Sequence, residues 1–252
     1  MEPGQTNQTG AHQPTNISLS VGALNVRHMS KSALLVWGGW HGHAPKECAE
    51  IFGLWLEEQN YQVDVSETLD AYRDTNYLKS FDLIVPIWTQ GELPRLHTGS
   101  LLEAVYSGVG IAGWHGAMGD SFRTNVDYQF LVGGQWVAHP GGLVEYEVNI
   151  KDRDDQITDG LDDFRIVSEQ YYMHVDPSNE VLATTTFTGS ETISAAAPYA
   201  CSWIANCVMP VVWKRRWGKG RVFFSSLGHQ PHDFDIPEVM TMTCRGLLWA
   251  SR

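Results

Sequence analysis

The sequence predicts an α/β fold in which a mainly parallel sheet lies between helices. Short apolar runs of the length of buried strands alternate along the chain with segments in which apolar residues recur at helical spacing. The strand segments are apolar on both faces, which is typical of parallel strands that helices cover on both sides. This repeated order of strand and helix therefore favours a parallel sheet built from crossover connections.

The first half of the chain contains the clearest elements. Residues 33–37 (ALLVW) predict a buried strand. Pro45 then begins a predicted helix, because proline is favoured at the first helical position and apolar residues follow it at helical spacing. The other predicted elements of this half are strands at 62–65, 81–87 and 109–114 and a helix that includes 101–106.

The second half of the chain is less regular. Residues 125–207 are dense in Gly, Asp and Pro, and we expect an irregular or antiparallel insertion there. The strand and helix pattern resumes at 211–214 (VVWK), continues with a strand at 221–226 (RVFFSS) and ends with a helix at 237–249. No linker divides the chain, so residues 31–252 are expected to form one domain with a sheet of five or six strands.

Residues 1–30 differ from the rest in composition. They are rich in Gln, Asn, Thr, Ser and Gly and show neither helical nor strand periodicity. The dipeptide His28-Met29 directly precedes the first apolar strand, as a cloning junction commonly does. We expect this segment to be a disordered tail or an expression remnant outside the domain.

Charge and composition exclude several classes of function. The chain has 29 acidic and 17 basic residues and a net charge of −12, which disfavours nucleic acid and anionic membranes as partners. No apolar window reaches the roughly 18 residues of a membrane helix, and no signal peptide is evident, so a cytoplasmic protein is expected. The four cysteines lack C-x-x-C spacing, which argues against a zinc ribbon or a redox dithiol.

Histidines gather directly after the predicted strands. Because the carboxyl ends of parallel strands meet at one edge of a sheet, ligands bind there and these side chains are expected to share a site. His139 is either an ordinary loop residue or part of the rim of that site. The histidines that follow strands are His41 and His43 after the first, His115 after the fourth, and His229 and His232 after the last.

A polar aromatic segment and two tryptophans add to these candidates. Residues 168–174 (SEQYYMH) carry Glu169, Tyr171 and His174. Trp40 and Trp114 each directly precede a candidate histidine. Aromatic faces beside polar groups suit sugar rings, although buried core aromatics explain most tryptophans equally well.

Several separate segments carry a family resemblance. The glycines of GWHG at 113–116 indicate a sharp turn that pushes His115 into the site. The chain from residue 32 to 252 resembles the trehalose utilisation (ThuA-like) family, a relative of the class I glutamine amidotransferase fold. The segments that carry it are WGGWHGHAPKE, GIAGWHGAMGD, FLVGGQWVAHP, SEQYYMHVDP and MPVVWKRRWGKGRVFFSSLGHQPHDF.

The resemblance implies a fold and a general role. The fold is a flavodoxin-like, doubly wound, mainly parallel sheet with helices on both faces and an irregular or antiparallel insertion. The role is in sugar metabolism, on keto sugars or glycosides related to trehalose. A glutamine amidotransferase needs a cysteine at the turn, because a thiolate attacks the amide, and His115 stands there instead. Glutaminase chemistry is therefore disfavoured.

Two chemical readings of the site stay open. The imidazoles and Glu169 either hold a divalent metal ion, Zn, Mn or Ni, or act without metal as general acid and base on a carbon beside a carbonyl. The metal reading is favoured, because converging imidazoles without metal repel one another whenever they are protonated. We assign His115 and Glu169 to catalysis, Trp40, His41, Trp114 and Tyr171 to substrate binding, and His43, His174 and His229 to the metal.

The expected partner is a small-molecule carbohydrate, no nucleotide cofactor is expected, and a homo-oligomer is left open. The alternative to an enzyme is a non-catalytic sugar-binding or regulatory protein that uses the same cleft. A metal titration separates the two, since loss of tight binding on His115→Ala supports the enzyme.

Overall fold

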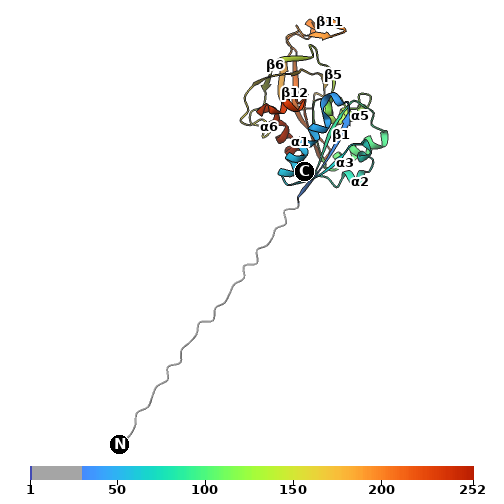
Figure 1. Cartoon of the computed structure of the whole chain (residues 1–252), viewed down its shortest axis with the longest axis vertical. Helices are drawn as coiled ribbons and strands as arrows, with labels where there is room; N and C mark the ends of the chain where they lie inside the picture. The colour runs from blue at the N-terminus through green and yellow to red at the C-terminus, as the bar shows by residue number, and fades with distance from the viewer. Residues whose placement is uncertain (2–29) are drawn as a thin grey trace.

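The computed structural model describes Met1 and residues 30–252, and a nine-stranded mixed sheet runs through it (Figure 1). The strand order is β2-β1-β3-β4-β13-β12-β9-β6-β7. The first five strands of this order pair in parallel, and the pairs from β13 to β7 are antiparallel. The predicted tail, apart from its ends, lies outside the described residues.

The parallel half contains every strand predicted from the apolar runs of the first half and the strand predicted at 221–226. In β1, which lies between β2 and β3, Ala33 to Val36 are fully buried because helices cover both faces of the sheet there. The five parallel strands are β1 (Lys31–Gly39), β2 (Tyr61–Ser66), β3 (Leu83–Thr89), β4 (Gly110–Trp114) and β13 (Gly220–Ser225).

The antiparallel half extends the same sheet. The antiparallel character expected for residues 125–207 is confirmed, and the segment 211–214, where the strand and helix pattern is expected to resume, is part of an antiparallel strand. Those residues belong to β12, which a tight turn at Gly218 joins to β13, and so short a connection permits only antiparallel pairing. The four strands are β6 (Leu143–Ile150), β7 (Phe164–Glu169), β9 (Glu180–Thr186) and β12 (Val208–Trp217), which bring the sheet to nine strands rather than five or six.

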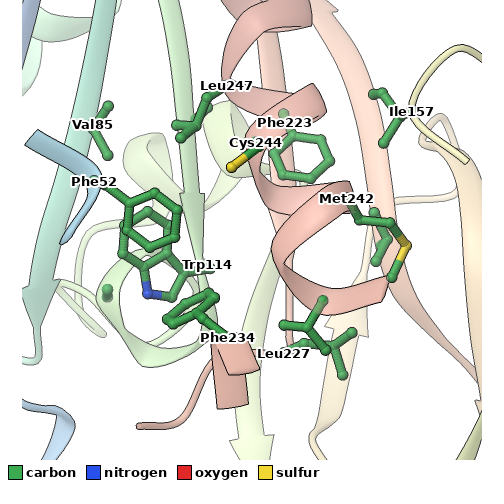
Figure 2. Close-up of a cluster of buried hydrophobic side chains, with 14 of the residues drawn as sticks. Phe52, Val85, Trp114, Ile157, Phe223, Leu227, Phe234, Met242, Cys244 and Leu247 are labelled. Carbon is green, nitrogen blue, oxygen red and sulfur yellow. The ribbon is translucent and has the colours of Figure 1, made fainter. Parts of the chain in front are cut away.

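Two hydrophobic cores lie on the two faces of the sheet. Successive side chains of a strand point to opposite faces, and Leu35 belongs to one core whereas Leu34 and Val36 belong to the other. Figure 2 shows part of the first core, where Phe52 and Leu247 come from two helices. The first core contains α1 (Pro45–Glu58) and α6 (Pro237–Ala250), and the second contains α2 (Thr75–Leu78), α3 (Arg95–Ser107) and α5 (Val126–Val132).

Short helices and short strands complete the structure. A small hairpin of β10 and β11 projects from the molecule at the top of Figure 1. None of the helices in the described part of the chain combines the length and apolar character needed to cross a membrane. The short elements are η1 (His41–His43), η2 (Leu69–Tyr72), α4 (His115–Gly119), β5 (Gly134–Ala138), β8 (Tyr172–Val175), β10 (Thr192–Ser194), β11 (Ala197–Ala200), η3 (Ser202–Ile204) and η4 (Pro231–Asp235).

Candidate metal centre

Three histidines and one glutamate converge beyond the carboxyl ends of the parallel strands. His43 lies in η1 after β1, His115 begins α4 after β4, and His229 lies in the loop after β13. Glu169 is the last residue of β7. One nitrogen or oxygen atom of each of these four residues lies within 4.8 Å of those of the other three. Because the carboxyl ends of parallel strands meet at one edge of the sheet, the histidines that follow three separate strands lie close together.

His115 occupies the centre of this group. Its backbone adopts a left-handed conformation with φ of 45°, so the chain turns sharply at the end of β4 as predicted. The side chain is 1% exposed, and its Nδ1 lies 2.8 Å from the carbonyl oxygen of Ser226. A carbonyl oxygen only accepts hydrogen bonds, so Nδ1 carries a proton and donates it. In the neutral imidazole, Nε2 therefore carries the lone pair.

That lone pair faces a carboxylate oxygen and a second imidazole nitrogen. His115 Nε2 lies 3.2 Å from Glu169 Oε2 and 3.3 Å from His229 Nδ1. A carboxylate oxygen and an imidazole lone pair repel each other at this distance, and either a proton on His115 Nε2 or a metal ion between the two groups removes this repulsion. The arrangement of donor atoms consequently fits a bound cation.

The other two imidazoles are held in the form that binds metal. His43 Nδ1 lies 2.9 Å from the Thr89 hydroxyl oxygen, which leaves Nε2 free to act as a ligand. Burial and the neighbouring His115 and His229 lower the pKa of His43 to about 3. Burial and His115 also lower the pKa of His229. Both groups are accordingly neutral at pH 7.

Glu169 supplies the negative charge. Burial alone raises the pKa of this carboxyl. A hydrogen bond from His115 and the positive charges of His115, His229 and His139, in their protonated forms, outweigh burial and lower the pKa to about 2. Its second oxygen, Oε1, lies 3.7 Å from His139 Nε2. The carboxylate thus faces the imidazole group with one oxygen and His139 with the other.

Two aromatic residues, Tyr171 and Trp136, lie beside the group. Tyr171 is 3% exposed and stacks on the His115 ring with centroids 4.0 Å apart. Trp136 and His139 line a hollow of about 620 Å³, and residues 192–195 of the projecting hairpin line it too. The sequence leaves His139 open as a loop residue or part of the rim, and the structure places it in the lining of this hollow and near Glu169.

The predicted substrate-binding residues separate into two groups. Trp40 is 47% exposed, and its ring lies edge-on to His43 with centroids 4.7 Å apart, so it borders the site. His41 is exposed in η1 and lies outside the four-residue group. Tyr171 packs beneath His115 as described. Only Trp40 therefore offers an exposed aromatic surface directly beside the imidazoles.

Two predicted site residues are placed elsewhere by the structure. His174 is exposed on β8, where Met173 beside it is buried, because successive side chains of a strand point to opposite sides. It does not join the metal-binding group. Trp114 is 1% exposed and packs between Phe52 and Phe234 in the core (Figure 2). The sharp turn after β4 sends His115 to the site and leaves Trp114 facing the core.

Replacing Trp114 is consequently expected to affect stability rather than recognition. Trp114→Ala removes a fully buried ring and should lower the free energy of unfolding by about 3–5 kcal/mol in urea denaturation. Trp114→Phe should lose less and keep wild-type metal affinity. If Trp114→Phe kept the stability of the wild type but bound metal more weakly, the Trp114 ring would belong to the site.

The depressed pKa of His43 predicts a pH-dependent stability in metal-free protein. The unfolded residue takes up its proton near pH 6.5, whereas the folded residue does so near pH 3. Between these values the unfolded state binds one more proton, so stability falls as the pH is lowered, by up to about 1.4 kcal/mol per pH unit. Urea denaturation with a chelator from pH 7 to 5 should show a shallower fall for His43→Gln. An equal fall in stability with pH for the wild type and for His43→Gln would contradict the lowered pKa of His43.

Comparisons with known proteins identify the family but not the chemistry. The family model described as trehalose utilisation, ThuA, matches residues 32–250. A search of curated proteins finds no match.

Three solved structures share the fold at low sequence identity. A putative ThuA-like protein from Bacteroides uniformis has 15% identity and a TM-score of 0.71, with 95% of each chain covered. A second one, from Parabacteroides merdae, has 18% identity and a TM-score of 0.66, with 87% of this chain and 89% of that chain covered. A cytoplasmic protein from Salmonella typhimurium LT2 has 11% identity and a TM-score of 0.60, with 88% of this chain and all of that chain (100%) covered. Because the family model spans nearly the whole described chain, this protein belongs to the trehalose utilisation (ThuA) family.

Proposed function

We propose that this chain is a metal-dependent enzyme that acts on keto sugars or glycosides related to trehalose, by isomerisation, elimination or hydrolysis. The observation that carries the proposal is the buried Nε2 lone pair of His115, which faces Glu169 and His229. The substrate class follows from the family description, trehalose utilisation.

The donor set fits a divalent ion of the first transition row. Three imidazole nitrogens and one carboxylate oxygen suit Zn, Mn or Ni better than calcium or magnesium, which prefer oxygen ligands. His43 and His229 are neutral and Glu169 is ionised, so the site offers lone pairs and a negative charge to a cation. His43, His115, His229 and Glu169 are the residues that would hold the ion.

The place of this group in the sheet supports ligand binding. We include in the proposal that the parallel half is flavodoxin-like, since the order β2-β1-β3-β4-β13 follows the 2-1-3-4-5 order of that class. In such sheets ligands bind where the chain order reverses, between β1 and β3. His43 follows β1, and its partner Thr89 ends β3.

The surrounding residues have separate tasks in this proposal. When bound, a divalent ion supplies a Lewis acid for a sugar oxygen. Glu169 Oε1 and His139 Nε2, 3.7 Å apart, hold or move a proton at the edge of the hollow. Trp40 and Trp136 offer aromatic faces to the sugar. The partner is a small-molecule carbohydrate, and a cytoplasmic location is proposed from the name of the Salmonella relative.

An assay over keto-glucosides and keto-trehalose tests the proposal. Protein stripped with chelator and reloaded with Mn, Zn or Ni should convert at least one substrate, and chelator should remove the activity. Ligand binding without conversion above a heat-killed control would replace the enzyme with a sugar-binding protein. The absence of both metal binding and sugar binding would end the proposal.

A further inference from the structure

Asp233 is a buried carboxylate that the proposed chemistry does not use. It lies in η4 and is 2% exposed. Its Oδ2 accepts hydrogen bonds from the Ser168 hydroxyl at 2.7 Å and from the His229 backbone N–H at 2.9 Å. Ser168 directly precedes Glu169. A single oxygen thus joins the two chain segments that carry the ligands Glu169 and His229.

The same segment contacts the other two ligand positions. Gln230 Nε2 donates to the carbonyl oxygen of Gly42, the residue before His43. The Ser226 carbonyl accepts from His115 Nδ1 at 2.8 Å. Residues 226–233 accordingly hydrogen-bond to a ligand or to the neighbour of a ligand on each of the other three segments.

Burying the charged carboxylate of Asp233 lowers the stability of the folded protein relative to an uncharged residue at the same position. Removing a carboxylate from water is expensive, and the nearest cationic candidate, His232, is 72% exposed with Nε2 3.5 Å from Asp233 Oδ1. A carboxylate oxygen accepts hydrogen bonds only, so it receives both the Ser168 hydroxyl and the His229 N–H without ambiguity. Asparagine loses the negative charge and keeps only one acceptor oxygen, and it loses both contacts whenever its NH2 group occupies the position of Oδ2.

We propose that Asp233 is a positioning residue of the metal centre, which holds Glu169 and His229 at ligand spacing through Ser168 and the His229 backbone. This inference rests on the proposed metal site. Groups that orient metal ligands typically contribute 10- to 100-fold to affinity. Asp235 lies in the same η4 element but is exposed, so it offers a matched control for a change of charge.

The test compares Asp233→Asn with Asp235→Asn in the full chain. Zn affinity is measured by competition with a chelating dye, the visible absorption of bound Co reports ligand geometry, and urea denaturation reports metal-free stability. We expect Asp233→Asn to weaken Zn binding about 10-fold or more and to alter the Co spectrum. Asp235→Asn should stay within about twofold of wild type.

A double-mutant cycle with Ser168→Ala separates positioning from general stability. Ser168→Ala alone should weaken Zn binding and alter the Co spectrum. It should add less than twofold in the Asp233→Asn background, because both substitutions act on the hydrogen bond between Ser168 and Asp233. It also serves as the test variant if Asp233→Asn does not fold. The inference would be overturned if Asp233→Asn bound Zn with wild-type affinity. It would also be overturned if Asp233→Asn lost stability but kept the Co spectrum of the wild type. A wild-type chain that binds no metal would instead overturn the metal centre and this inference with it.

Discussion

His115→Ala is expected to abolish stoichiometric binding of a divalent metal ion, with a loss of affinity of at least 100-fold. His115 is the central residue of the group, since its Nε2 lies 3.2 Å from Glu169 and 3.3 Å from His229. Alanine removes this ligand and also the hydrogen bond that fixes the site to Ser226. Equilibrium dialysis with metal analysis measures the number of ions bound per chain.

His232→Ala is the control for this experiment. His232 lies three residues after His229, but its side chain is 72% exposed. The His232→Ala variant should bind one ion with wild-type affinity. Urea denaturation of the metal-free His115→Ala variant should show that this variant still folds. Retained stoichiometric binding in His115→Ala would remove this residue from the metal site.

Glu169→Gln is expected to lower turnover on keto sugars by about 100-fold or more while the protein still binds metal. The substitution keeps the shape of the side chain and removes its charge. The three imidazoles remain as ligands, and three protein ligands suffice for many catalytic metal sites. The oxygen that faces His139 loses its capacity to take up a proton. The expected signature is therefore a larger loss of kcat than of metal affinity.

Glu145→Gln is the matched control for the charge. Glu145 lies on β6, which pairs with the strand that carries Glu169, and its side chain is 60% exposed. Turnover and metal affinity should both stay near wild type. Unchanged turnover in Glu169→Gln, with activity present in wild type, would assign the proton transfer to another residue.

The parallel half of the fold and three of the four group members could be predicted from local sequence. Apolar runs such as 33–37 mark buried strands, and the histidines that follow strand ends include the three of the group. His41 and His232 also follow strands but lie outside it. Glu169 was found through its segment and the family resemblance, not through its position in the sheet. These predictions succeed because each depends on residues close together in the chain.

The predictions that failed depend on long-range pairing or on side-chain direction. His174 and Trp114 were placed in the site because they neighbour candidate residues, but a strand sends adjacent side chains to opposite faces. The sheet has nine strands rather than five or six, because β9 joins β12 and β6 joins β9, pairings between residues far apart in sequence that carry the antiparallel segment into the main sheet. His139 reaches Glu169 because β5 pairs with β8, a pairing that no local pattern indicates.

The most direct test of the metal centre is a crystal structure of the full chain soaked with Mn or Zn, with data collected at the absorption edge of the metal. We predict one anomalous peak surrounded by the side chains of His43, His115, His229 and Glu169, at about 2.0–2.2 Å from its ligand atoms. If these side chains are ordered in this arrangement at saturating metal but show no anomalous peak, the metal centre is contradicted. A proton on His115 Nε2 would then account for the contact with Glu169.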